Sequence, residues 1–175
     1  MKKSFKEELH HIGCFVFDVD GVMTDGTLYL DAQGELVRKM SVRDGYALKQ
    51  ALASGYEVCV ITGGTNESVR TRLRDLGIHS IYLGAHQKLQ VLKEYFEIHQ
   101  ISPATALYMG DDIPDLEAMQ YCHLATCPAD AAAEIRSSAD YVSPIKGGAG
   151  CVRDVIEQVL KVKGDWNIDS STTSA

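Results

Sequence analysis

The stretch CFVFDVDG, residues 14–21, decides the fold and much of the chemistry of this chain. Its apolar half is continuous rather than alternating, which is typical of a strand covered on both faces, as in a parallel sheet. Asp18 and Asp20 stand at the end of that strand, and Gly21 follows them. The stretch therefore predicts a buried strand that presents two carboxylates at its carboxyl end.

Further short apolar runs follow this strand, at residues 56–62, 80–84, 105–110, 123–127 and 140–143. Segments with apolar residues at helical spacing accompany them, at residues 69–76, 89–96 and 152–159. Gly77, just after the first of these segments, is a plausible helix cap. Strands and helices that alternate with short connections predict an α/β fold with a doubly wound, mostly parallel sheet.

One segment departs from this alternation. Residues 27–40, TLYLDAQGELVRKM, hold two strand-like arms around residues 31–34, which predicts a projecting β-hairpin. The remaining stretches between the polar strand ends have room for single helices and strands, and not for a separate cap domain. We therefore expect an open site that acts on large substrates or is covered by a neighbouring subunit.

The length of 175 residues predicts one domain over residues 1–164, followed by a polar, Ser/Thr-rich tail, 165–175, that is expected to be disordered. With 17 basic and 24 acidic residues the chain lacks the positive charge that nucleic-acid binding requires, so no nucleic-acid partner is expected. No apolar stretch approaches the roughly 20 residues of a membrane span, so no membrane association is expected either.

The chain has five cysteines, an odd number without regular spacing. Most lie in apolar stretches, where cysteine behaves as a small hydrophobic residue. Cys122, His123 and Cys127 lack the second ligand pair that a zinc site of this spacing would need. The pattern favours reduced thiols in the core of a cytoplasmic protein.

The carboxyl ends of the predicted strands carry the candidate functional residues. In an open α/β sheet the functional crevice lies beyond these ends. The sequence TGG at 62–64 ends the second strand, GDD at 110–112 follows the fourth, and Lys88 opens the helix after the third. We expect these residues to meet Asp18 and Asp20 at one edge of the sheet.

Three carboxylates at one sheet edge repel one another unless a proton or a cation relieves them. Mg²⁺ prefers oxygen ligands and leaves positions for phosphate, so Asp18, Asp20 and Asp111 predict a magnesium site. Phosphoryl transfer also requires donors that neutralise the phosphate oxygens, and Lys88 and Thr62 can supply them. Each motif alone has an ordinary interpretation as a turn, a solvated lysine or a strand end, but their joint order favours catalysis.

These motifs resemble those of the haloacid dehalogenase-like (HAD) phosphatases. FDVDGVMTDG at 17–26, VITGG at 60–64, Lys88 within GAHQK, and GDDIPD at 110–115 match the four family motifs in order, over nearly the whole chain. The resemblance implies a phosphatase that forms an aspartyl-phosphate intermediate.

The resemblance also implies a role for each matching residue. Asp18 is then the nucleophile, and Asp20 protonates the leaving oxygen and later deprotonates the attacking water. Thr62, Gly63 and Lys88 bind the phosphoryl oxygens, and Lys88 also keeps Asp18 ionised. Asp20 contacts the substrate as well.

The metal ligands follow from the same resemblance. Asp18, Asp111 and the backbone carbonyl of Asp20 would bind Mg²⁺. Asp112 or Asp115 would support the site from nearby, and the motif does not decide between these two.

Within the superfamily the chain is most similar to the lidless 3-deoxy-D-manno-octulosonate 8-phosphate phosphatases. SVRDGY at 41–46 and GGAGCVR at 147–153 resemble segments of that family. The resemblance implies hydrolysis of this sugar-acid phosphate during lipopolysaccharide precursor synthesis. It also implies a homotetramer in which the hairpins meet centrally and the C-terminal segment reaches a neighbouring site.

Arg43, with Asp44 and Gly45, is then a candidate for binding the substrate carboxylate, because guanidinium pairs bidentately with carboxylates. Arg43 could instead be a surface charge, and the glycines at 147–150 could simply turn the chain into its last helix. Gly64 stands where many family members have arginine, so a nine-carbon sugar-acid 9-phosphate is an alternative substrate.

Two other classes of protein share some of these features. Phosphoacceptor modules also combine clustered aspartates, a threonine and a lysine, but they accept phosphate after the third strand and lack a second aspartate two residues later. A non-catalytic regulatory subunit is a further alternative, because a fold does not imply a function. The motif order, with Asp18 at the end of the first strand and Asp20 beside it, argues against a phosphoacceptor module. The complete set of chemical residues argues against a non-catalytic subunit.

Overall fold

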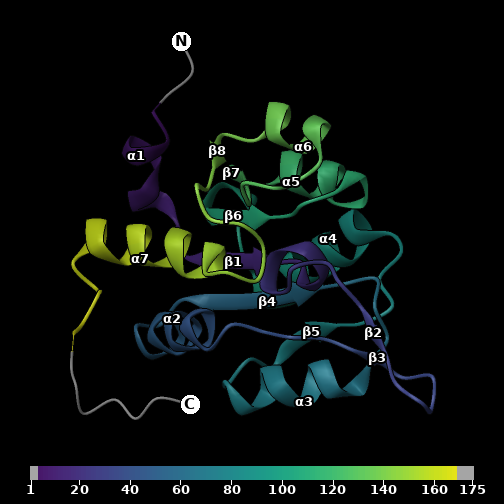
Figure 1. Cartoon of the computed structure of the whole chain (residues 1–175). Helices are drawn as coiled ribbons and strands as arrows, with labels where there is room; N and C mark the ends of the chain where they lie inside the picture. Colours follow the sequence, from purple (N-terminus) through teal and green to yellow (C-terminus); the bar gives the residue numbers. More distant parts are fainter. Residues whose placement is uncertain (1–3, 169–175) are drawn as a thin grey trace.

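The computed structural model describes residues 4–168, which form a large parallel sheet and a separate hairpin (Figure 1). The large sheet has six strands in the order β5-β4-β1-β6-β7-β8. They are β1 (Cys14–Phe17), β4 (Glu57–Ile61), β5 (Ser80–Tyr82), β6 (Ala106–Met109), β7 (Leu124–Cys127) and β8 (Tyr141–Val142). All neighbouring pairs are parallel, which confirms the predicted fold class.

Helices cover both faces of the sheet, and each face has its own apolar core (Figure 1). One face carries α2 (Val42–Ala53), α3 (Glu67–Asp75) and α7 (Cys151–Lys163). The other carries α4 (Lys88–His99), α5 (Leu116–Tyr121) and α6 (Ala133–Ser138). Within β1, Phe15 and Phe17 belong to the first core and Val16 to the second. This double burial explains why the strand is continuously apolar.

The short helix α1 (Phe5–Glu8) precedes β1. Most other connections are short. The predicted helix cap at Gly77 is confirmed, because its backbone is left-handed, with φ +93°, and its N–H donates to the carbonyl of Arg74. Only glycine adopts this conformation readily, so the chain turns directly from α3 toward β5.

The register of the central strands determines where the polar segments that follow them lie. Cys14 of β1 pairs with Glu57 of β4 on one side and with Ala106 of β6 on the other. Because the three strands start level and run parallel, the segments that follow them begin at the same edge of the sheet.

The predicted hairpin is confirmed and is small. β2 (Tyr29–Leu30) and β3 (Leu36–Val37) pair antiparallel, and the turn between them is stabilised by Asp31, whose Oδ1 accepts the N–H groups of Gln33 and Glu35. Within residues 4–168 there is no separate cap domain, as expected from the sequence.

The segment predicted to be a disordered tail divides at the limit of the described residues. Asp165 accepts a hydrogen bond from the hydroxyl of Tyr56 at 2.7 Å, and Trp166 packs edge-on against Tyr46. Residues 169–175 lie outside the described part of the chain.

Within residues 4–168, no helix combines the length and the apolarity needed to cross a bilayer. All five cysteines are free and buried, as the sequence pattern indicates.

Candidate active site

A pocket of about 450 Å³ lies at the carboxyl edge of the sheet. It brings together most of the predicted site residues, namely Asp18, Asp20, Thr62, Gly63, Lys88, Asp111, Asp112 and Asp115. Gly64 also lines it. The side chains come from the ends of three neighbouring strands and from the first residue of α4. The predicted convergence at one sheet edge is therefore present.

Asp18 follows β1 and is almost fully buried, with 6% of its surface exposed. Its Oδ1 accepts the N–H of Val19 at 2.7 Å and lies 3.0 Å from Nζ of Lys88. Burial, and next the charge of Asp115, raise the pKa of Asp18, and Lys88 acts in the opposite direction. Lys88 thus stabilises the ionised form of this carboxylate.

Lys88 is buried between two carboxylates. Its Nζ lies 2.7 Å from Oδ1 of Asp115 as well as 3.0 Å from Asp18. Burial alone would lower the pKa of Lys88, but the charges of Asp18 and Asp115 outweigh that effect and raise it. The lysine therefore remains a cation at the floor of the pocket.

Asp115, rather than Asp112, holds this floor together. Asp115 accepts hydrogen bonds from Lys88 and from the hydroxyl of Tyr108 on Oδ1. Its Oδ2 accepts the backbone N–H groups of Asp111 at 3.1 Å and Asp112 at 3.5 Å. Asp112 is exposed, and its carboxylate accepts hydrogen bonds within its own turn, from the N–H of Ile113 and from the backbone of Asp115.

Three carboxylates are placed to hold a metal ion. Asp18, Asp111 and Asp115 each offer an oxygen atom within 4.8 Å of the others. Burial, and next the charge of Asp115, raise the pKa of Asp111 to about 7. Crowded, partly buried carboxylates with raised pKa values fit a hard cation with oxygen ligands, such as Mg²⁺.

Gly21 leaves space for the carboxylate of Asp111, one of the candidate metal ligands. Its φ is +87°, and a Cβ at this position would collide with the carboxylate of Asp111. The glycine-rich segment at 147–150 approaches the same loop, because a Cβ on Gly147 would collide with the carbonyl of Gly21. The backbone approach gives these glycines a structural role at the site, beyond turning the chain into α7.

Thr62 and Gly64 form the opposite wall. Thr62 is buried, and its Oγ1 accepts the N–H of Gly64 at 3.2 Å, which fixes the hydroxyl at the pocket wall. The carbonyl of Thr62 accepts the N–H of Ala85, so the loop before Lys88 is tied to this strand end. This geometry accounts for the proximity of two motifs that are far apart in the sequence.

Asp20 directs its carboxylate toward a residue that the sequence motifs do not mark. Arg38, which follows β3 of the hairpin, contacts both oxygens: Nε lies 2.6 Å from Oδ1 and Nη2 lies 3.0 Å from Oδ2. With this carboxylate engaged by Arg38, the predicted contribution of Asp20 to the metal is its backbone carbonyl. A single arginine in a hairpin arm carries no pattern that would identify it, and the same is true of Tyr108 within β6.

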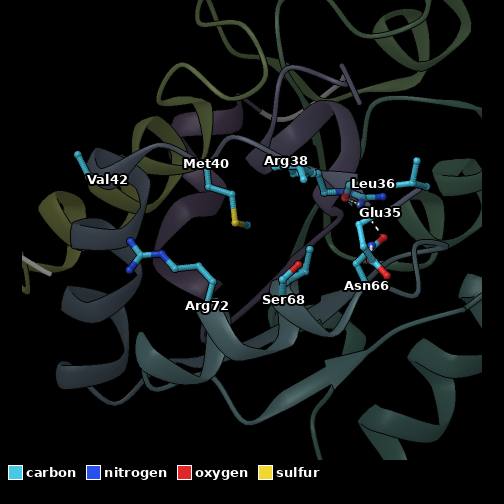
Figure 2. Close-up of a pocket in the computed structure, with 10 residues that line it drawn as sticks. Glu35, Leu36, Arg38, Met40, Val42, Asn66, Ser68 and Arg72 are labelled. Atoms are coloured by element: carbon cyan, nitrogen blue, oxygen red, sulfur yellow. Dashed lines mark hydrogen bonds between the residues drawn. The ribbon is translucent and has the colours of Figure 1, made fainter. Parts of the chain in front are cut away.

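A second pocket, of about 540 Å³, lies between the hairpin arm and α3 (Figure 2). Arg38 lines it, with Met40, Asn66 and Arg72 among the other residues. Because Arg38 also contacts Asp20, its side chain stands between this pocket and the catalytic one.

Arg43, Asp44 and Gly45 do not line the catalytic pocket of the chain. Arg43 lines a separate cavity of about 620 Å³ beside α7. Asp44 accepts the N–H of Arg153, and a Cβ on Gly45 would lie 3.2 Å from the side chain of Leu76. A role for these three residues in substrate binding remains a prediction.

No family model matches the chain. The 3-deoxy-D-manno-octulosonate 8-phosphate phosphatase KdsC of Escherichia coli strain K12 is 38% identical over 154 residues, which cover 88% of this chain and 82% of that protein. The crystal structure of the phosphatase of the same name from Yersinia pestis aligns with a TM-score of 0.90 and 34% identity, over 93% of this chain and 88% of that one.

A third relative was crystallised with ligands. The 3-deoxy-D-manno-octulosonate 8-phosphate phosphatase from Moraxella catarrhalis, in complex with a magnesium ion, a phosphate ion and a KDO molecule, aligns with a TM-score of 0.87. It is 32% identical, over 90% of each chain. The parallel sheet with its cluster of aspartates and a lysine at the carboxyl edge defines a HAD-type protein. Within that class, the chain belongs to the 3-deoxy-D-manno-octulosonate 8-phosphate phosphatase family.

Proposed function

We propose that the chain is a magnesium-dependent phosphatase that hydrolyses 3-deoxy-D-manno-octulosonate 8-phosphate. The observation that carries the proposal is the buried carboxylate of Asp18, held against Lys88 in a pocket that also contains Thr62 and Asp111. A buried anion beside a fixed cation is the arrangement expected of a carboxylate nucleophile for phosphoryl transfer. The names of the similar proteins support the substrate.

The reaction would proceed in two balanced steps. The cycle begins with Asp18 ionised and Asp20 protonated. First, a carboxylate oxygen of Asp18 attacks phosphorus, the bond between phosphorus and the sugar oxygen breaks, and Asp20 gives its proton to the departing oxygen. Then water attacks phosphorus and gives its proton to Asp20. The bond between phosphorus and Asp18 breaks, inorganic phosphate leaves, and both aspartates return to their initial state.

The rest of the pocket would stabilise the charge on the phosphoryl group. Lys88 and the hydroxyl of Thr62 would face its oxygens. Asp18 and Asp111, with Asp115 and the carbonyl of Asp20, would hold Mg²⁺, which when bound neutralises charge on the phosphate oxygens. Asp115 would keep Lys88 in place between the carboxylates.

The direct test is phosphate release from a panel of sugar and sugar-acid phosphates, with Mg²⁺ and with EDTA. We expect magnesium-dependent preference for the 8-phosphate over a nine-carbon sugar-acid 9-phosphate and over simple sugar phosphates. Asp18→Asn should lose activity, whereas Asp75→Asn, on the exposed end of α3, should keep it. A preference for simple sugar phosphates would reject the substrate, and an active Asp18→Asn enzyme would reject the mechanism.

We also propose that the chain assembles through its hairpin, as a homotetramer. The hairpin exposes apolar side chains, with Tyr29 52% and Leu30 76% exposed, and within residues 4–168 no separate cap domain covers the pocket. Exposed apolar groups on a small hairpin favour burial against another subunit. Light scattering should give four times the mass of the chain, and Leu30→Asp should reduce it. Ile98→Asp, at an exposed apolar residue on α4, should not.

The thiol chemistry supports the predicted cytoplasmic location. All five cysteines are free and buried, and burial raises the pKa of Cys127 to about 11. Such thiols are unreactive and form no disulfides, as expected in a reducing compartment.

A further inference from the structure

Arg38 is a buried cation on an otherwise exposed hairpin. Its side chain is 5% exposed, whereas the neighbouring Lys39 is 67% exposed. The guanidinium of Arg38 binds both carboxylate oxygens of Asp20, with distances of 2.6 Å and 3.0 Å. This two-point contact fixes the plane of the carboxylate as well as its position. A lysine would supply the same charge without that geometry.

The guanidinium is itself fixed by two other elements. Its Nη1 donates to the carbonyl of Leu36 in β3 at 2.9 Å and to Oδ1 of Asn66 at 2.7 Å. Asn66 is the N-cap residue directly before α3, and it lies beside Arg38 and Leu36 in Figure 2. The side chain of Arg38 therefore joins the hairpin, the start of α3 and Asp20.

Gly64 provides the space for this pair. A Cβ on residue 64 would lie 3.1 Å from Nη2 of Arg38 and 3.5 Å from Oδ2 of Asp20. A side chain at this position would therefore require Nη2 of Arg38 to shift by a few tenths of an ångström. Arg38 and Gly64 thus form a matched pair: the hairpin supplies the cation, and the strand end leaves room for it.

Asp20 depends on this contact for its orientation. One third of its side chain is exposed, and within residues 4–168 the hydrogen bonds that its carboxylate accepts come from Arg38. A partly exposed aspartate without such a partner would sample several rotamers. A catalytic group that must meet a departing oxygen loses rate when it is displaced by as little as 1 Å.

We infer that Arg38 is a positioning residue, which holds the carboxyl group of Asp20 where, once protonated, it can give its proton to the leaving oxygen. The inference rests on the proposed function. It makes the hairpin part of the catalytic apparatus, because any movement of β3 relative to α3 moves Arg38 and with it the proton donor. It also predicts that the importance of Arg38 depends on the leaving group.

The test compares two leaving groups in the variant Arg38→Met. A sugar alkoxide needs a proton to depart, whereas p-nitrophenolate is a weak base and departs without one. The ratio kcat/KM reports the steps up to departure of the leaving group. We expect kcat/KM for the sugar-acid phosphate to fall about 30-fold and that for p-nitrophenyl phosphate to fall less than about 3-fold. Equal losses, or no loss, would overturn the inference.

A double-mutant cycle with Asp20→Ala separates this role from a structural one. If Arg38 acts through Asp20, adding Arg38→Met to Asp20→Ala should change kcat/KM by less than about 2-fold. A further loss as large as in the wild-type background would assign Arg38 only to folding of the hairpin. Arg38→Lys should recover part of the rate, and Lys39→Met, which removes an exposed cation from the same arm, should have no effect.

A crystal structure of Arg38→Met tests the positioning role of Arg38 even if the proposed substrate is wrong. If the wild-type protein hydrolyses another alkyl phosphate, the leaving-group comparison is made with that substrate, and only the proposed substrate fails. If it hydrolyses none, the phosphatase proposal fails. In either case an Asp20 carboxylate that stays in place without Arg38 would overturn the inference, and a rotated or disordered one would support it.

Discussion

The catalytic edge of the sheet and the junction between α2 and α7 each bury an aspartate, with different partners. Asp115, 1% exposed, accepts hydrogen bonds from Lys88, from Tyr108 and from two backbone N–H groups. Asp44, 2% exposed, accepts one from the N–H of Arg153, and its Oδ2 has no partner within residues 4–168. Burial alone therefore does not mark a site. The number of partners and the charge they carry distinguish the two regions.

The difference has an electrostatic reason. At the catalytic edge a cation and several donors compensate the buried carboxylates in part. The pKa values of Asp18 and Asp111 stay raised, which leaves the cluster suited to the positive charge of a bound metal ion. At the α2–α7 junction the first turn of α7 supplies a backbone donor and the positive end of a helix dipole, which compensate one carboxylate in part. Burial accordingly raises the pKa of Asp44 to about 6, although its contact with Arg153 opposes the rise.

The largest effect is expected from removing the cation of the catalytic edge. Lys88→Met would leave Asp18 and Asp115 facing each other without the ammonium group that lies within 3.0 Å of both. We expect kcat to fall about 10³-fold, because a charge-stabilising donor is lost where negative charge develops. Steady-state kinetics, with circular dichroism to verify folding, would measure the loss.

Lys93→Met is the matched control for that substitution. Lys93 lies exposed on the same helix, above the ring of Tyr121, and should tolerate replacement with little change in rate. A Lys88→Met enzyme that retained a tenth of the wild-type activity would mean that the buried cation is structural, and the contrast between the two regions would disappear.

A smaller effect is expected at the α2–α7 junction, on stability. Because the pKa of Asp44 in the folded state, about 6, exceeds the reference value of 3.8, the native protein binds this proton more tightly than the unfolded chain. The resulting stability is complete below about pH 4 and is lost as the pH rises through about 6. Relative to Asp44→Asn, the wild-type free energy of unfolding should fall by about 2–3 kcal/mol between pH 4 and pH 7.

Urea unfolding at several pH values would measure this difference, with Asp75→Asn as an exposed control. A constant difference between wild type and Asp44→Asn would contradict the junction role. The same variant tests the predicted substrate contact of Asp44. An unchanged KM would mean that Asp44 has only a structural role at the α2–α7 junction. A raised KM would support its predicted contact with the substrate.

The elements and residues that could be predicted share one property. Each is indicated by a pattern within a short stretch of the sequence. Continuous apolar runs bounded by turns indicated the six strands, and the polar residues directly after them fell at one edge because parallel strands in register end together. Asp18, Thr62 and Asp111 were predictable for that reason. Lys88 was predictable because it begins the helix after a strand.

What could not be predicted depends on three-dimensional contacts. The choice of Asp115 over Asp112 depends on the turn at Ile113–Asp115, which directs one carboxylate inward and leaves the other exposed. Arg38 contacts Asp20 from 18 residues further along the chain, and nothing in its hairpin arm marks it. Arg43 lies in the first turn of α2, whose rotation places it beside α7, away from the catalytic pocket.

The smallest effect is expected on the pH dependence of Mg²⁺ binding, which compares charge compensation at the catalytic edge with that at the α2–α7 junction. Because the pKa of Asp111 is about 7 and that of Asp18 is raised, protons compete with Mg²⁺ for the same oxygens. The dissociation constant for Mg²⁺ should therefore fall at least about fivefold between pH 6 and pH 7 and level off once both carboxyl groups are ionised. Calorimetry in buffers of different ionisation enthalpy would detect the released protons. A dissociation constant independent of pH would mean that Lys88 already keeps the cluster ionised, so that the catalytic edge, unlike the α2–α7 junction, fully compensates its buried charge.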